Sequence, residues 1–158
     1  MLRFILAVGL GLVCSAAQAE TRPDPVARIV AIYDGYRHAQ PGPDLGPIYG
    51  DRLQGLLDAD RAATPDGEVG TIDWDVFVDG NDVELGAVAA VLVSLDGDNA
   101  VVRARFTNHG QPSDLSFDLV FEHGGWRVAD IKTERQGVPW SMAKVLADAL
   151  AALPAGRQ

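Results

Sequence analysis

Acidic, basic and imidazole side chains gather around a Gly-Gly pair in FDLVFEHGGWRVADI, which spans residues 117–131. General acid–base catalysis uses these side-chain types. They are Asp118, Glu122, His123, Arg127 and Asp130. The segment therefore has the composition of an active site, although alternation of polar and apolar residues is also typical of a strand with one solvent-facing side.

The Gly-Gly pair at 124–125 predicts a hairpin turn. If the two glycines are its central residues, where a positive φ is needed, Phe121 pairs with Val128. Glu122 then meets Arg127 on the opposite face as a cross-strand ion pair. A strand follows the glycines, whereas phosphate sites use a helix N-terminus there. We therefore interpret the segment as a bend in a sheet.

Asp130 is the one candidate for a catalytic residue. By strand alternation it shares the face of Trp126 and Val128, which we expect to point inward. A buried carboxylate with a raised pKa beside a tyrosine would form a proton-transfer pair. The aromatic candidates for lining the same interior are Tyr33, Tyr36, Trp74 and Trp126. We interpret Asp130 as a cap at the end of the sheet and the two tyrosines as core residues, with the proton-transfer pair as the alternative.

No metal or cofactor site is predicted. None of His38, His109 and His123 lies at metal-binding spacing from another potential ligand in the sequence. Residues 66–98 hold nine acidic side chains and no Lys or Arg. Neither aspartate-rich loop in this range has the ligand pattern of an EF-hand. We interpret the range as a solvated acidic surface, with a weak divalent-cation or basic-partner surface as the alternative.

The N-terminal MLRFILAVGLGLVCSAAQAE has a basic start, an apolar run and small residues before Glu20. This pattern predicts a secretory signal peptide over residues 1–19, cleaved between Ala19 and Glu20. The apolar run, residues 4–13, is much shorter than the roughly 20 residues of a membrane-spanning helix, and no later segment is apolar enough to span. We expect Cys14 to leave with the peptide and the protein to be periplasmic.

Residues 20–158 are then expected to form a single domain. Removal of residues 1–19 takes away one arginine, so 12 Lys and Arg face 22 Asp and Glu, a net charge of −10. The remaining chain has no cysteine and no disulfide. Its acidic surface repels phosphate backbones, which argues against a nucleic-acid partner.

Apolar periodicity predicts helices at both ends of the domain and strands between them. A first helix begins at Pro25 with Asp24 as N-cap, and a second opens near Pro47. The period changes to two from Val88. The strands expected after that point are 88–95, 100–108, 115–122 and 126–134, and a last helix begins near Ser141. The sequence therefore indicates an α+β fold.

Three segments carry a family resemblance: DWDVF at 73–77, GGWRVADI at 124–131 and WSMAKVLADAL at 140–150. They resemble the bacterial envelope family labelled domain of unknown function 3828, within the nuclear-transport-factor-2-like (cystatin-like) superfamily. The resemblance implies N-terminal helices packed on a curved antiparallel β-sheet forming a cone, plus a C-terminal helix. It supplies no catalytic residues, and fold alone does not fix function.

The expected function is a non-catalytic periplasmic module that binds a small apolar ligand or an envelope protein. One alternative is an acid–base enzyme acting on a small hydrophobic substrate in the cone, with Asp130 as base. Another is an envelope scaffold or a neutralising partner of a second protein. Homodimerisation through the open sheet face, where Arg103 and Arg105 would meet acids, also stays open.

Overall fold

The computed structural model describes residues 22–37, 46–135 and 137–154. In chain order the elements are α1 (Pro25–Arg37), α2 (Asp51–Ala63), β1 (Ala89–Asp96), β2 (Asn99–Asn108), β3 (Gln111–Glu122), β4 (Gly125–Arg135), β5 (Val138–Ser141) and α3 (Met142–Ala151). None of the helices in the described ranges has the length and apolar character needed to cross a membrane. The expected cleavage between Ala19 and Glu20 and the loop residue His38 lie outside these ranges.

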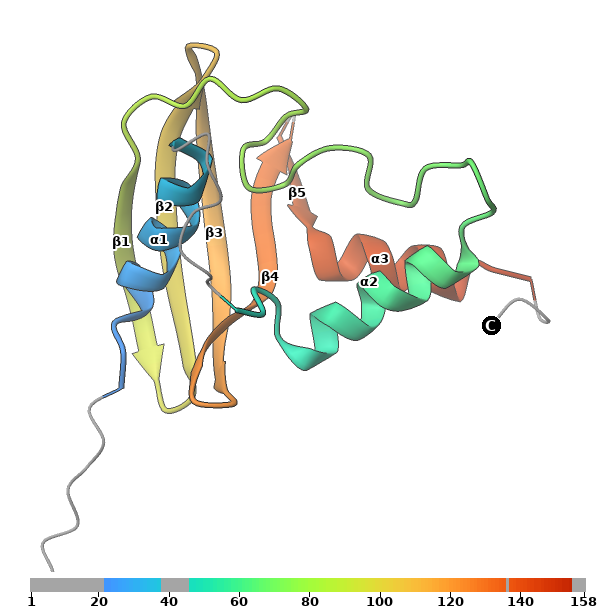
Figure 1. Cartoon of the computed structure of the whole chain (residues 1–158), viewed down its shortest axis with the longest axis horizontal. Coiled ribbons are helices and arrows are strands. Elements are labelled where there is room, and N and C mark those ends of the chain that lie inside the picture. The colour runs from blue at the N-terminus through green and yellow to red at the C-terminus, as the bar shows by residue number, and fades with distance from the viewer. Residues whose placement is uncertain (1–21, 38–45, 136, 155–158) are drawn as a thin grey trace, which may run out of the picture.

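The five strands form one antiparallel sheet in the order β1-β2-β3-β4-β5, which is curved and does not close (Figure 1). Helix α1 crosses β1 and β2, whereas α2 and α3 lie side by side next to β4. The expected α+β fold with a C-terminal helix after the sheet is therefore confirmed. Asp24 accepts a hydrogen bond from the backbone N–H of Val26 at 2.9 Å, as expected for a residue capping α1.

The core is centred on one face of the sheet, where α1 and the 76–78 loop pack, and it continues into buried residues of α2 and α3. Alternate residues of β2 and β3 are buried on this face, and the rings of Phe77 and Phe117 stack at 5.8 Å between their centroids. Phe121 and Trp126 lie on the same face as Phe117, as predicted, with their rings 5.3 Å apart. Burial of each such side chain contributes about 1.5–3 kcal/mol to folding, so this face holds the sheet against the helix.

The turn between β3 and β4 differs by one residue from the sequence-based prediction. Phe121 pairs with Trp126 and Glu122 with Gly125, so His123 and Gly124 are the central residues of the turn. Both have positive φ, 52° and 75°, as a type I′ turn requires. The expected pairing of Glu122 with Arg127 is therefore wrong. Histidine is one of the few non-glycine residues that adopts this conformation readily.

A bulge in β4 corrects the predicted orientation of Asp130. The register shifts between Asp118 and Leu119, so that Ile131 pairs with Phe117 and Asp130 pairs with Asp118. Cross-strand partners share a face, so it is Ile131 that joins the core face. The alternation that placed Asp130 with Trp126 is broken because a bulge adds one residue to one strand.

The segment before α2 forms an additional bridge to the sheet. Tyr49 pairs in parallel with Val128, and the N–H of Gly50 donates to the Val128 carbonyl at 2.9 Å. Helix α2 therefore begins at Asp51, not near Pro47 as predicted. Strand β5 was not predicted either.

Candidate functional site

The interior candidates Tyr33 and Trp126 are buried core residues. Their exposed fractions are 1% and 2%. The Tyr33 hydroxyl donates to the Phe77 carbonyl at 2.9 Å, and the indole N–H of Trp126 donates to the Pro23 carbonyl at 2.7 Å. Burial also raises the pKa of Tyr33 far above its usual value. Their polar atoms are thus used within the fold, and their rings fill the space where the cone was expected to hold a ligand.

Tyr36 lies at the end of α1 and binds a loop carboxylate. Its hydroxyl donates to Oδ2 of Asp75 at 2.6 Å. Burial, and then the hydrogen bond to Asp75, raises the pKa of Tyr36 well above the usual value. The other oxygen of Asp75 accepts the backbone N–H of Phe77 at 2.9 Å. Asp75 therefore ties the DWDVF loop to α1, which is not the role expected for a residue of a solvated acidic surface.

Trp74 is only partly buried, and it packs against the edge of the core. Its ring lies 5.4 Å from that of Trp140 on β5. The structure thus separates Trp74 from Trp126, although both were candidates for the same binding surface. Tyr33, Tyr36, Trp74 and Trp126 do not line the cleft around Arg103 and Asp114 or the two clefts next to α2.

Asp130 holds the N-terminus of α3. It is 8% exposed, and its two carboxylate oxygens accept hydrogen bonds from the Ser141 hydroxyl at 2.7 Å and from the Ala143 N–H at 2.9 Å. The Ser141 hydroxyl in turn accepts the N–H of Lys144 at 3.1 Å, so it caps the helix. Both oxygens of Asp130 are therefore engaged by the fold.

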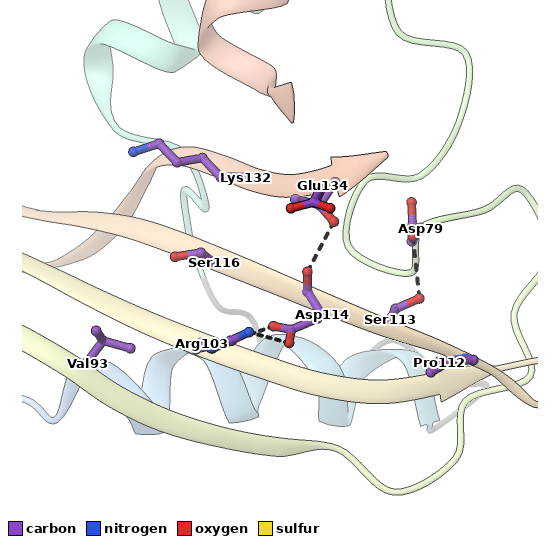
Figure 2. Close-up of a pocket in the computed structure, with 10 residues that line it drawn as sticks. Asp79, Val93, Arg103, Pro112, Ser113, Asp114, Ser116, Lys132 and Glu134 are labelled. Atoms are coloured by element: carbon purple, nitrogen blue, oxygen red, sulfur yellow. Dashed lines mark hydrogen bonds and ion pairs between the residues drawn. The ribbon is translucent and has the colours of Figure 1, made fainter. Parts of the chain in front are cut away.

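The candidate functional site is a cleft on the exposed face of the sheet, with a volume of about 610 Å³. Residues from all but the last strand contribute to it, together with a loop residue (Figure 2). The lining residues are Asp79, Val93, Arg103, Pro112, Ser113, Asp114, Ser116, Lys132, Thr133 and Glu134. The cleft is open to solvent, and eight of its ten lining residues are polar or charged, so it suits a polar segment better than an apolar ligand.

Arg103 and Asp114 form the central contact of this cleft. Two nitrogens of Arg103 bind the two carboxylate oxygens of Asp114, each at 2.6 Å (Figure 2). Nε of Arg105 approaches the same carboxylate at 3.0 Å. The hydrogen bond from Arg103 lowers the pKa of Asp114 and keeps it ionised. Arg103 and Arg105 were expected to meet acidic residues at a dimer interface. In the structure they bind Asp114 of the same chain.

Further charges surround this central pair. Lys132 binds Asp118, and Ser113 donates a hydrogen bond to Asp79 at 3.4 Å. Strand alternation predicts that several of these side chains share a face, but it cannot show that four strands bring them into one cleft. Chemically, the site offers ion-paired groups of both signs. These groups suit binding to a polar surface.

Asp51, Glu122 and His123 form a second polar cluster, at the turn after β3. One ligand atom from each lies within 4.8 Å of the other two, which is compatible with a divalent metal. However, Glu122 accepts the Asp51 N–H at 2.6 Å, and Nε2 of His123 lies 2.9 Å from the Asp51 carboxylate. The hydrogen bond to Asp51 raises the pKa of His123. These contacts fasten the first turn of α2 to the hairpin, and we assign the cluster that structural role.

The acidic range 66–98 does not form one uniform surface. Seven of its nine carboxylates are exposed, whereas Asp75 and Asp79 are half-buried. Asn108 organises the loop between them and β1: its amide donates to the carbonyls of Val78 and Asp82, at 3.0 and 2.9 Å, and accepts the N–H of Glu84 at 2.8 Å. Asn108 was not predicted to have this role, because an asparagine at the end of a strand is typical of an ordinary turn.

Fold and site together define an α+β protein with a five-stranded meander, a filled core and a polar cleft on the exposed sheet face. Comparison of the chain with models of known families, with curated proteins and with solved structures finds no match. The resemblance to the envelope family described above stays a prediction. The proposals that follow rest on the geometry of this chain.

Proposed function

We propose that the protein is an exported, non-catalytic binding module of the bacterial envelope, and that it binds a protein partner through the cleft around Arg103 and Asp114. The observation that carries the proposal is a contrast between the two sides of the sheet. Tyr33, Phe77 and Phe117 pack together on the inner side, whereas the outer side has a cleft of about 610 Å³. This contrast favours a polypeptide over a small apolar ligand.

The charges of the cleft support a partner with polar and charged side chains. Arg103, Lys132, Asp114 and Glu134 present both signs within one depression. Complementary charges of this kind guide association and fix the orientation of a partner more than they add affinity. The acidic net charge, −9 for the full chain and −10 after the expected cleavage, further favours a partner surface that is basic around the contact.

Site-specific photo-cross-linking in living cells tests the binding face. A photoreactive amino acid at Ser116, within the cleft, should give one cross-linked product of defined mass. The same group at Ala62, exposed on α2 and outside the cleft, should not. Equal products at both sites, or none at Ser116, would contradict the proposal. So would a small apolar molecule that stays bound to the purified protein in native mass spectrometry.

Export is tested separately. The basic start, apolar run and small residues before Glu20 support removal of residues 1–19 during secretion. N-terminal sequencing of protein from the periplasmic fraction should begin at Glu20. A protein that keeps Met1 and stays in the cytoplasmic fraction would remove the export part of the proposal and leave the binding face untouched.

A further inference from the structure

The free edge of β1 carries the densest group of exposed apolar side chains in the described part of the chain. Of the eight large apolar side chains exposed within the described ranges, half lie on this one strand, with exposed fractions from 45% to 59%. They are Val91, Leu92, Val93 and Leu95. Single exposed apolar residues are ordinary, but four close together on one strand form a patch that marks an interaction surface.

Strand β1 also has an unpaired backbone edge. Within the described residues it pairs with β2 alone, so one side of its backbone has no strand beside it. Proteins usually protect such edges with charged residues, proline or short strands. The opposite edge, β5, is four residues long and contains Pro139. By contrast β1 is eight residues long, and residues 87–95 contain neither a charge nor a proline.

The apolar side chains of β1 lie on both faces of the sheet. Leu92 and Leu95 pair with the core residues Val102 and Ala100, whereas Val93 lines the cleft on the exposed face. The bulge between Leu92 and Ser94 permits this arrangement, because it interrupts strict alternation. An occupant of this edge must therefore supply apolar side chains on both of its own faces.

We propose that two copies of the chain pair through their β1 strands, antiparallel about a two-fold axis, to form one continuous sheet. A second β1 meets the requirement for apolar side chains on both faces, and two-fold pairing makes the contact self-complementary. The inference goes beyond the proposed binding function. It would place two copies of the cleft on one extended outer surface.

Charge is compatible with a second copy as the occupant. Two chains that each carry a net charge of −9, or −10 after the expected cleavage, repel one another over most of their surfaces. The uncharged range 87–95 is an exception. With the axis between Leu92 and Val93, Asp96 of one copy lies opposite Ala89 of the other, so no like charges face each other across the new strand pair.

Analytical ultracentrifugation of the purified protein tests this pairing. We expect the wild type to sediment as a dimer at high micromolar concentration and to dissociate on dilution. Val91→Lys places a charge on the free edge, outside the cleft, and should give a monomer with unchanged circular dichroism. The matched control is Val138→Lys on β5, which is 64% exposed on the opposite edge and should remain dimeric.

Cysteine cross-linking gives a second test that does not depend on Val91. Cys14 is the only native cysteine, so the Cys14→Ser background is free of thiols. In that background Val93→Cys should form an intermolecular disulfide on mild oxidation, because Cα atoms close to the axis lie within disulfide reach, and Val138→Cys should not. A wild type that is monomeric at every concentration overturns the proposal and assigns the edge to another occupant. Equal cross-linking at both cysteines also overturns it.

Discussion

Asp130, on β4, accepts a hydrogen bond from the backbone N–H of Ala143, the second residue of α3, at 2.9 Å. The same carboxylate accepts the hydroxyl of Ser141, which is the N-cap of that helix. A side chain from the sheet and one from the helix boundary thus together accept the hydrogen bonds of backbone N–H groups at the start of α3. This arrangement explains why a carboxylate is tolerated at 8% exposure.

We expect Asp130→Ala to lower the free energy of unfolding by about 2–4 kcal/mol, because it removes two charge-assisted hydrogen bonds from a helix N-terminus. Asp130→Asn keeps one acceptor oxygen and should cost about half as much. Urea denaturation followed by circular dichroism measures both. Asp148→Ala, which removes only an exposed pair with Lys144 on α3, is the control and should change stability by less than about 0.5 kcal/mol. An Asp130→Ala protein as stable as that control would return Asp130 to the catalytic candidates.

Gly50 and Gly55 provide a second, matched pair of substitutions. A Cβ at Gly50 would lie 2.9 Å from Oε1 of Glu122 and 3.0 Å from Cγ1 of Val120, so Gly50→Ala should displace Glu122 from the Asp51 N–H. We expect a loss of about 1–2 kcal/mol. Gly55 is exposed within α2, and a Cβ added there would have nothing within 4 Å, so Gly55→Ala should stabilise the protein by about 0.5–1 kcal/mol. Thermal melts that move both variants in the same direction would contradict this account of the β3–α2 junction.

The sequence was sufficient for the elements with a strong period. Helix α1 and the buried alternation of β2 and β3 lie close to the predicted ranges, because each has one apolar face and a recognisable start. The prediction of the turn after β3 was wrong by one residue. A type I′ turn accepts glycine at either central position, so the local sequence does not distinguish Gly124-Gly125 from His123-Gly124 as the central pair. Strand β5 was not predicted because it has only four residues and contains Pro139, which is more typical of a loop.

Long-range contacts account for the remaining differences. Helix α2 begins later in the chain than predicted because Tyr49 forms a β-bridge with Val128 in β4. The local sequence around Tyr49 does not indicate a pairing partner so distant in the chain. The cleft was missed for a similar reason: Arg103, Asp114 and Lys132 come from three strands, and their contacts depend on register. Tyr33 and Trp126, two of the candidates for lining a ligand cavity, are packed in the core instead. Their polar atoms donate hydrogen bonds to backbone carbonyls, so both side chains can be buried.

The contact between His123 and Asp51 should make stability depend on pH. Its hydrogen bond raises the pKa of His123 above the usual value of about 6.5. A histidine whose pKa is higher in the folded state stabilises the fold when it is protonated. This contribution is therefore full below about pH 6.5 and is lost as the pH rises through the higher folded-state pKa.

His123→Asn isolates this effect, because asparagine also suits the positive φ of a type I′ turn. The wild type should melt at a higher temperature than His123→Asn in mild acid, and the difference should shrink in alkaline buffer. In NMR titrations, Asp51→Asn should lower the pKa of His123. A melting-temperature difference that does not change with pH, or an unchanged His123 pKa in Asp51→Asn, would show that the ion pair is absent in solution.

The hydrogen bond between Tyr36 and Asp75 connects α1 to the loop that carries Val76, Phe77 and Val78 into the core. Tyr36→Phe removes the donor and leaves the half-buried Asp75 with one fewer partner. We expect a loss of about 1.5–3 kcal/mol, the range for hydrogen bonds to charged groups. Tyr49→Phe is the matched control: Tyr49 stacks on the same Phe77 ring at 6.1 Å, and its hydroxyl has no hydrogen-bond partner among the described residues. If chemical denaturation gives the two variants equal stability, the loop is held by the packing of Phe77 alone, and the hydroxyl of Tyr36 contributes nothing to it.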